Sequence, residues 1–113
     1  MYEIQKTFEV AGAHRLTLDY DSQCQNLHGH SWIITVYSRC LDLNKNGMVI
    51  DFTEIKKLVH DKMDHKCLND VFDFNPTAEN IAEWITSVVP HCYKASVQES
   101  IGNIASYTVE DLV

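Results

Sequence analysis

The sequence predicts an α+β domain in which a four-stranded antiparallel sheet carries two helices on one face. Two observations lead to this prediction. Runs rich in β-branched and aromatic residues lie near both ends of the chain, over about residues 3–14, 30–41, 93–99 and 104–109. Between them, apolar residues recur at helical spacing in two segments. The predicted order is therefore ββααββ, and all 113 residues are expected to form one domain.

The first two strands flank a long loop. The first strand alternates apolar and polar residues and then loses its bulky side chains around Gly12, which predicts a bend or bulge there. Residues 15–29 form a loop of a length that often carries function. The second strand leads to a turn at residues 44–47, after which residues 48–50 are expected to add a short strand and complete a hairpin.

Two helices are expected in the middle of the chain. Asp51, with Glu54 three residues later, predicts a capped helix over 52–63. Residues 64–70 are expected to form an irregular polar loop. The apolar face of this helix contains Phe52, Ile55, Leu58, Val59 and Met63. Thr77 is the expected cap of the second helix, which Pro90 ends. Its inner side contains Ile81, Ala82, Ile85, Val88 and Val89. The last two strands then form a hairpin around residues 102–103.

Composition excludes several classes of protein. Nine basic and 16 acidic residues give a formal net charge of -7, which argues against general binding to nucleic acid or to an anionic membrane. The sequence contains neither a signal-peptide pattern at its start nor an apolar run long enough for a membrane span, so a cytoplasmic protein is expected. The four cysteines have no CxxC spacing, and in a reducing compartment they are most simply free thiols.

The segment Cys24 to His30 holds the clearest chemical signal. His28 and His30 are separated only by Gly29, so at the start of a strand both side chains point to the same side and can share one metal ion. Cys24 lies four residues upstream in a polar loop. The alternative interpretations are surface or structural histidines and a free loop thiol.

Two further residues extend this signal. His14 ends the strand that is expected to pair with the one that His28 and His30 begin, and three histidines with an open fourth position are typical of catalytic zinc. Glu99 lies on the apolar face of its predicted strand, where burying a carboxylate without a partner is costly in free energy. Glu99 either reaches solvent at the strand end or anchors a ligand that presents N–H donors.

The motifs of this chain together resemble those of the pterin synthases of the tunnelling fold, the family of 6-pyruvoyltetrahydropterin synthase and 6-carboxytetrahydropterin synthase. The resemblance covers nearly the whole chain in order. The matching blocks are Phe8 to Leu16, Cys24-x-x-x-His28-Gly29-His30, Asp51-Phe52, Asp64-His65-x-x-Leu68-Asn69, Asn75-Pro76-Thr77-x-Glu79-Asn80 and Glu99. After Glu99 the chain departs from the family, because residues 100–103 replace a continuation that usually contains Thr.

The resemblance implies a role for each matching position. The zinc (Zn²⁺) ligands it implies are His14, His28 and His30, and Cys24 matches a catalytic thiol that acts as general base. The residues that activate the thiol, commonly from a neighbouring subunit, match Asp64 and His65. The pterin anchor matches Glu99, and the pterin pocket matches Thr77 and Glu79, which alternatively only cap and begin the second helix.

The resemblance also implies a substrate, 7,8-dihydroneopterin triphosphate, and a homo-oligomer, typically a hexamer with active sites shared between subunits. The expected reaction is the zinc-dependent lyase reaction of the queuosine (7-deazaguanine) pathway, which releases 6-carboxytetrahydropterin, acetaldehyde and triphosphate. The alternatives are a pyruvoyl synthase that eliminates only triphosphate and a non-catalytic zinc- or pterin-binding module. A zinc hydrolase is less well supported, because HExxH spacing is absent.

Overall fold

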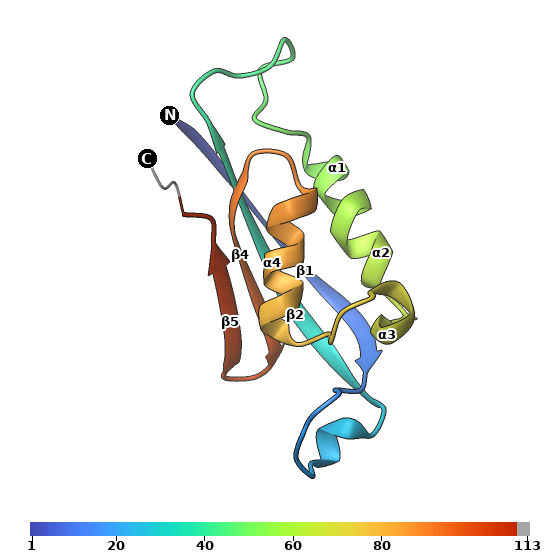
Figure 1. Ribbon diagram of the computed structural model, residues 1–113. Coiled ribbons are helices and arrows are strands. Elements are labelled where there is room, and N and C mark those ends of the chain that lie inside the picture. The colour runs from blue at the N-terminus through green and yellow to red at the C-terminus, as the bar shows by residue number, and fades with distance from the viewer. Residues whose placement is uncertain (111–113) are drawn as a thin grey trace.

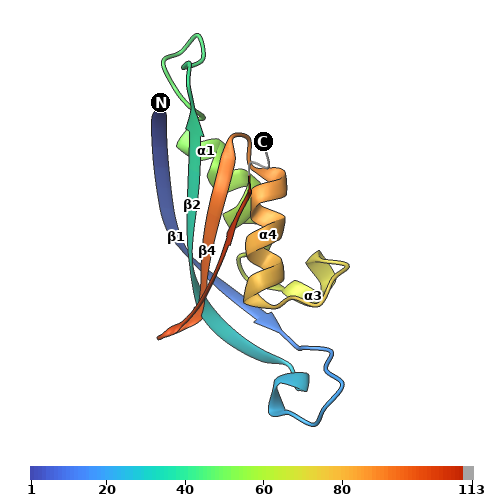
Figure 2. The same cartoon turned by 60° about the vertical axis from the view of Figure 1, so that its left-hand side comes forward.

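Five strands form one sheet, and all the α-helices lie on one side of it, as the two ribbon views show (Figures 1 and 2). The structure is a computed structural model that describes residues 1–110. The strand order is β3-β1-β2-β4-β5. The strands are β1 (Tyr2–His14), β2 (His28–Cys40), β3 (Lys66–Cys67), β4 (Cys92–Ser100) and β5 (Asn103–Thr108). The helices are the 3₁₀-helix η1 (Gln23–Gln25), α1 (Phe52–Ile55), the π-helix η2 (Lys56–His60), α2 (Asp61–Met63), α3 (Leu68–Val71) and α4 (Ala78–Val88).

The sheet confirms four long antiparallel strands and corrects the prediction in three places. A fifth strand, β3, pairs in parallel with β1 at Gly12 and Ala13, so the sheet is mixed. A two-residue strand carries no alternation, which is why the sequence could not reveal it. Residues 48–50 lie outside the sheet, although Val49 and Ile50 are buried. The predicted bulge at Gly12 is also absent, because β1 and β2 pair without a register shift from residue 2 to residue 14.

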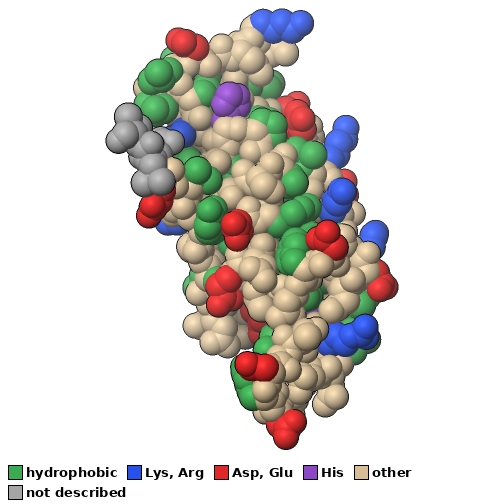
Figure 3. Space-filling model, in the orientation of Figure 1, with side chains coloured by type: hydrophobic (Ala, Val, Ile, Leu, Met, Phe, Trp, Pro, Cys, Tyr) green, Lys and Arg blue, Asp and Glu red, His purple; other side chains and the backbone are tan. Residues whose placement is uncertain are grey.

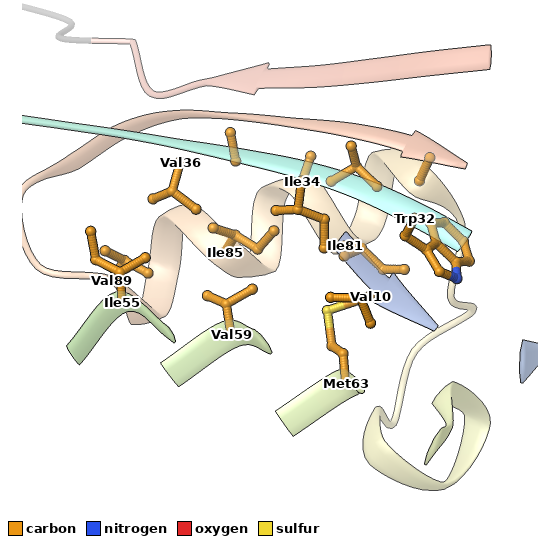
Figure 4. Close-up of a cluster of buried hydrophobic side chains, with 14 of the residues drawn as sticks. Val10, Trp32, Ile34, Val36, Ile55, Val59, Met63, Ile81, Ile85 and Val89 are labelled. Atoms are coloured by element: carbon orange, nitrogen blue, oxygen red, sulfur yellow. The ribbon is translucent and has the colours of Figure 1, made fainter. Parts of the chain in front are cut away.

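Side-chain alternation gives the sheet one apolar face. Even-numbered residues of β1 and β2 and odd-numbered residues of β4 point toward the helices, where Val10, Ile34 and Val97 are fully buried. Figure 4 shows these strands facing the helices across a common core. The helices contribute Ile55, Val59, Met63, Ile81, Ile85 and Val89 to this core. The predicted inner faces are thus confirmed except at Phe52, which is 48% exposed.

The helical segment after residue 51 is less regular than predicted. Asp51 caps it as expected, since its carboxylate accepts the N–H of Thr53 at 2.8 Å. The single helix predicted over 52–63 contains the π-helical turn η2, in which the N–H of Asp61 bonds to the carbonyl of Lys56, five residues back. The predicted polar loop at 64–70 instead contains β3 and the start of α3. Thr77 caps α4 by accepting the N–H of Asn80 at 3.1 Å, as predicted.

The other face of the sheet carries no helix (Figure 2). Its side chains are largely polar, and Thr7 and Thr35 form a cross-strand hydrogen bond there at 3.0 Å. On the helix-covered face, acidic side chains are spread from one end to the other (Figure 3). Within residues 1–110, no helix is long and apolar enough to cross a membrane.

Candidate functional site

Three histidines meet at one end of the core because of the pairing of β1 with β2. His14 lies directly opposite His28, and His30 lies opposite Gly12, two residues further along the ladder. Since all three positions are even-numbered, the three rings project to the helix-covered face. One nitrogen from each ring lies within 4.8 Å of the other two. The structure therefore brings the three predicted metal ligands together, in a group that can hold a metal ion.

Backbone carbonyls orient two of these rings. The Nδ1 atom of His14 donates to the carbonyl of Pro76 at 2.8 Å, and that of His28 donates to the carbonyl of Asn26 at 2.7 Å. Each ring therefore carries its proton on Nδ1 and leaves Nε2 as a free lone pair, the arrangement that metal-binding histidines use.

Two ring nitrogens of this cluster are buried without a hydrogen-bond partner. They are Nε2 of His14 and Nε2 of His30. A buried nitrogen with no partner is costly in free energy, and a metal ion coordinated at both atoms would remove that cost. Burial lowers the pKa of both histidines and so favours the neutral form that binds metal. The donor set and its protonation state thus fit a divalent metal such as zinc.

Glu99 lies beside this cluster rather than reaching away into solvent. One carboxylate oxygen is 3.3 Å from Nε2 of His30, and the other is 3.9 Å from Nε2 of His14. The carboxylate raises the pKa of both histidines, an effect smaller than that of burial. A pocket of about 250 Å³ separates Glu99 from the start of α4, and Glu79 and Asn103 line it. Two carboxylates at one pocket can accept several N–H donors from a ligand.

Asp64 and His65 form a hydrogen-bonded pair at the edge of β1. The Nδ1–H of His65 donates to one oxygen of Asp64 at 2.8 Å, and the other oxygen accepts the N–H of Ala11 at 3.0 Å. These two hydrogen bonds, that of Ala11 foremost, lower the pKa of Asp64 and keep it ionised. His65 has a positive φ of 58°, and its side chain is 82% exposed. The pair can therefore present the Nε2 atom of His65 as an acid or base to a group outside this chain.

Cys24 lies in the 3₁₀-helix η1 of the loop between β1 and β2. Ser22 caps this turn by accepting the N–H of Cys24 at 3.1 Å, and the carbonyl of Cys24 accepts the N–H of Leu16 at 2.8 Å. The residue is exposed, while the other three cysteines are partly buried. Its backbone is fixed and its thiol is accessible.

The single chain does not gather every predicted site residue. His65 borders a hollow of about 520 Å³ that is otherwise lined by Ala11, Gly12, Ala13, Gly29, His30, Ser31 and Lys66. The odd-numbered strand residues among these point to the bare face of the sheet, whereas the three histidine rings point to the helix-covered face. His65 thus borders a hollow whose strand lining lies mainly on the opposite side of the sheet from the histidine rings.

Four contributors to the site, two side-chain positions and two backbone carbonyls, were missed by sequence reasoning. The indole of Trp32 packs edge-on against His14, with ring centroids 4.9 Å apart, and donates to the carbonyl of Gly12 at 3.1 Å. A Cβ on Gly12 would lie 3.3 Å from that indole nitrogen, so the glycine makes room for the ring. The carbonyls of Pro76 and Asn26 carry no sequence signal, because every residue has one.

Comparison with known proteins gives a consistent picture. The family model for 6-pyruvoyl tetrahydropterin synthase matches residues 3–110. The chain is 32% identical to the 6-carboxy-5,6,7,8-tetrahydropterin synthase of Haemophilus influenzae, covering 86% of this chain and 88% of that protein. It is 28% identical to the Bacillus subtilis enzyme of the same name, with 88% and 80% covered. The solved structure of Caenorhabditis elegans 6-pyruvoyl tetrahydropterin synthase superposes with a TM-score of 0.74, at 28% identity and 96% coverage of both chains.

Proposed function

This chain belongs to the 6-pyruvoyl tetrahydropterin synthase family, and from that premise we propose that it is a zinc-dependent 6-carboxytetrahydropterin synthase. The proposed substrates are 7,8-dihydroneopterin triphosphate and one water molecule, and the products are 6-carboxytetrahydropterin, acetaldehyde and triphosphate. The observation that carries the metal part of the proposal is the pair of buried Nε2 atoms of His14 and His30, which have no hydrogen-bond partner within residues 1–110 and lie beside His28. The carboxy reaction is favoured because the two bacterial relatives above bear that name.

Substrate binding is assigned to the pocket at the start of α4. Glu99 accepts N–H groups of the pterin ring, and Glu79 borders the same pocket. Thr77 is already engaged as the helix cap, so any contact it makes with the pterin is additional to that role. The ring is reduced as the side chain is oxidised, so no external redox cofactor is required.

Proton transfer is assigned to the thiol and the Asp64–His65 pair. As a thiolate, Cys24 takes the proton from the carbon of the substrate side chain. Asp64 holds the Nδ1–H of His65, which leaves Nε2 of that ring free to exchange a proton with the thiol. His14, His28 and His30 would hold the zinc ion, which would supply Lewis acidity to the reaction.

The proposed active site is shared between subunits of a homo-oligomer, with a hexamer as the proposed size. The exposed side chain of His65 borders a hollow whose strand lining lies mainly on the bare face of the sheet. Both long edge strands, β1 and β5, also have an unpaired side over most of their length, and exposed edges are normally covered or paired. Because β1 and β5 run in opposite directions, copies set side by side in one orientation meet as antiparallel strands.

The test is to incubate zinc-loaded protein with 7,8-dihydroneopterin triphosphate and to identify the products by mass, with Cys24→Ala as the control. Carboxytetrahydropterin with acetaldehyde supports the proposal and a place in queuosine (7-deazaguanine) synthesis. A pyruvoyl product would instead assign the second candidate, 6-pyruvoyltetrahydropterin synthase, which the similarity to the nematode structure favours. No turnover with metal and pterin both bound would leave a non-catalytic binding module.

A further inference from the structure

Two asparagine side chains hold the segment that follows His14. The side-chain oxygen of Asn69 accepts the N–H of Arg15, and its Nδ2 donates to the carbonyl of Arg15, both at 2.9 Å. Asn75 makes the same pair of bonds with Thr17, at 2.9 and 3.1 Å. A primary amide has the shape of a peptide group, so each asparagine pairs with one backbone residue as a neighbouring strand would. We call this arrangement of Asn69 and Asn75 the asparagine clamp.

The opposite edge of the clamped segment is bonded to Cys24. Leu16 lies between the two clamped residues, and its N–H donates to the carbonyl of Cys24 at 2.8 Å. In an extended segment, the backbone groups of successive residues point to opposite edges. Residues 15–17 therefore connect the asparagine clamp on one side to the turn that carries the thiol on the other.

The clamp also shares its support with the histidine cluster. Asn75 precedes Pro76, whose carbonyl orients His14. The carbonyl of Asn75 accepts a bond from Nδ2 of Asn80, on the first turn of α4, at 2.9 Å. Asn69 follows Leu68, which is fully buried in the core. One rigid region thus fixes both the ring of His14 and the loop of Cys24.

We propose that Asn69 and Asn75 are positioning residues, which set the place of Cys24 relative to the histidine cluster through the five hydrogen bonds named above at residues 15–17. The catalytic meaning of this inference rests on the proposed function, because it treats Cys24 as the base. The structural part stands independently, because the hydrogen bonds that Asn69 and Asn75 make to residues 15 and 17 involve neither a histidine of the cluster nor Glu99.

The activity test compares Asn69→Ala and Asn69→Asp, with Asn46→Asp as a matched control in the turn beyond the far end of β2. Displacement of a catalytic group by about 1 Å can cost up to about 100-fold in rate. We expect Asn69→Ala to lower kcat by about 10- to 100-fold with KM nearly unchanged, since the pterin pocket is intact. Asn69→Asp keeps the acceptor for Arg15 and should retain more activity, whereas Asn46→Asp should match wild type.

Two further measurements need no substrate. Amide hydrogen exchange at Leu16 should become about tenfold or more faster in Asn69→Ala. The rate at which iodoacetamide alkylates Cys24, measured by peptide mass against Cys40, should change by about threefold or more, since access governs thiol reactivity. If a folded Asn69→Ala protein shows the wild-type rates of exchange at Leu16 and of alkylation at Cys24, the proposed role of the clamp is wrong. If the alanine variant does not fold, the same two rates are measured in Asn69→Asp and judged by the same criteria.

These measurements also distinguish the proposed function from the proposed role of the clamp. A wild-type protein that turns over no pterin contradicts the proposed function, while the exchange and alkylation rates still test whether the clamp holds the Cys24 turn. A full loss of the clamp with unchanged kcat contradicts the positioning role of Asn69 even in an active enzyme.

Discussion

The Nδ1 atom of His14 donates to the carbonyl oxygen of Pro76 at 2.8 Å, and this one bond ties the histidine cluster to the segment that begins α4. It fixes the ring tautomer and turns Nε2 toward His28 and His30. Because the pocket of Glu79 and Glu99 lies at the same segment, metal and pterin are expected to meet at one place.

Zinc should stabilise the folded protein. Coordination satisfies two buried nitrogens that have no hydrogen-bond partner among the described residues, and a ligand at 1,000 times its Kd adds about 4 kcal/mol to the free energy of unfolding. Thermal unfolding of chelator-treated protein, with and without added zinc, measures the difference. The increase should vanish in His30→Ala and persist in His65→Ala, which lies outside the cluster. An equal increase in both variants would contradict the site.

The metal-free protein should lose stability as the pH falls below 6.5. Burial lowers the folded-state pKa of His14 and His30 below their ordinary value of 6.5, so below that pH the unfolded chain binds more protons. The stabilisation is fully present above pH 6.5 and is lost as the pH falls toward the folded pKa, with a slope of at most about 1.4 kcal/mol per pH unit for each histidine. Urea unfolding between pH 5 and pH 8 measures this slope. Replacing His14 by Gln should reduce it.

Mixed oligomers should recover activity from two inactive variants. Cys24→Ala and His65→Ala remove partners that the proposal places on different chains. Random mixing in equal amounts leaves about one quarter of the sites with both native residues. Activity measured after the two variants are unfolded and refolded together should approach that fraction, and each variant alone should remain inactive. A mixture as inactive as its components would argue against a shared site.

Glu99→Gln should weaken pterin binding. A hydrogen bond to a charged group contributes about 1.5–3 kcal/mol, so KM should rise by about 10- to 100-fold. Zinc content should be unchanged, because the three histidines remain. Steady-state kinetics with metal analysis measures both quantities. An unchanged KM would mean that Glu99 interacts with the histidines and does not bind the pterin.

Thr77 has a structural role that can be separated from a binding role. Thr77→Ala removes the cap of α4 and should cost about 1 kcal/mol in the free energy of unfolding, whereas Thr77→Ser keeps the hydroxyl acceptor. Urea unfolding measures the stability, and KM measures pterin binding. If KM rises in Thr77→Ala but not in Thr77→Ser, and by more than the loss of stability explains, then the hydroxyl of residue 77 contacts the pterin as well as capping α4.

The sequence predicted the four long strands, the two main helical segments and the three clustered histidines, because each rests on a local pattern. Alternation placed His28 and His30 on one side of their strand, and the expected strand pairing brought His14 to the same end of the sheet. Parity placed Glu99 on the apolar face of its own strand. The contribution of Pro76 was not predictable, since it is made by a backbone carbonyl. Asn69 and Asn75 stood inside recognisable motifs, yet their partners at residues 15 and 17 lie more than 50 positions away and only the fold brings them together.

The π-helical turn at Lys56–His60 bears on which changes of chain length this protein tolerates. A bond from Asp61 back to Lys56 encloses one residue more than an α-helical bond would. Each residue turns a helix by about 100°, so deleting one residue from an ordinary helix would rotate everything beyond it. Here a single deletion at the exposed Lys57 can be absorbed by reverting the wide turn to α-helix, which keeps Asp64 at the edge of β1. The segment thus contains one residue more than an α-helix needs, so a single deletion can be neutral there even though the Asp64–His65 pair follows closely in the chain.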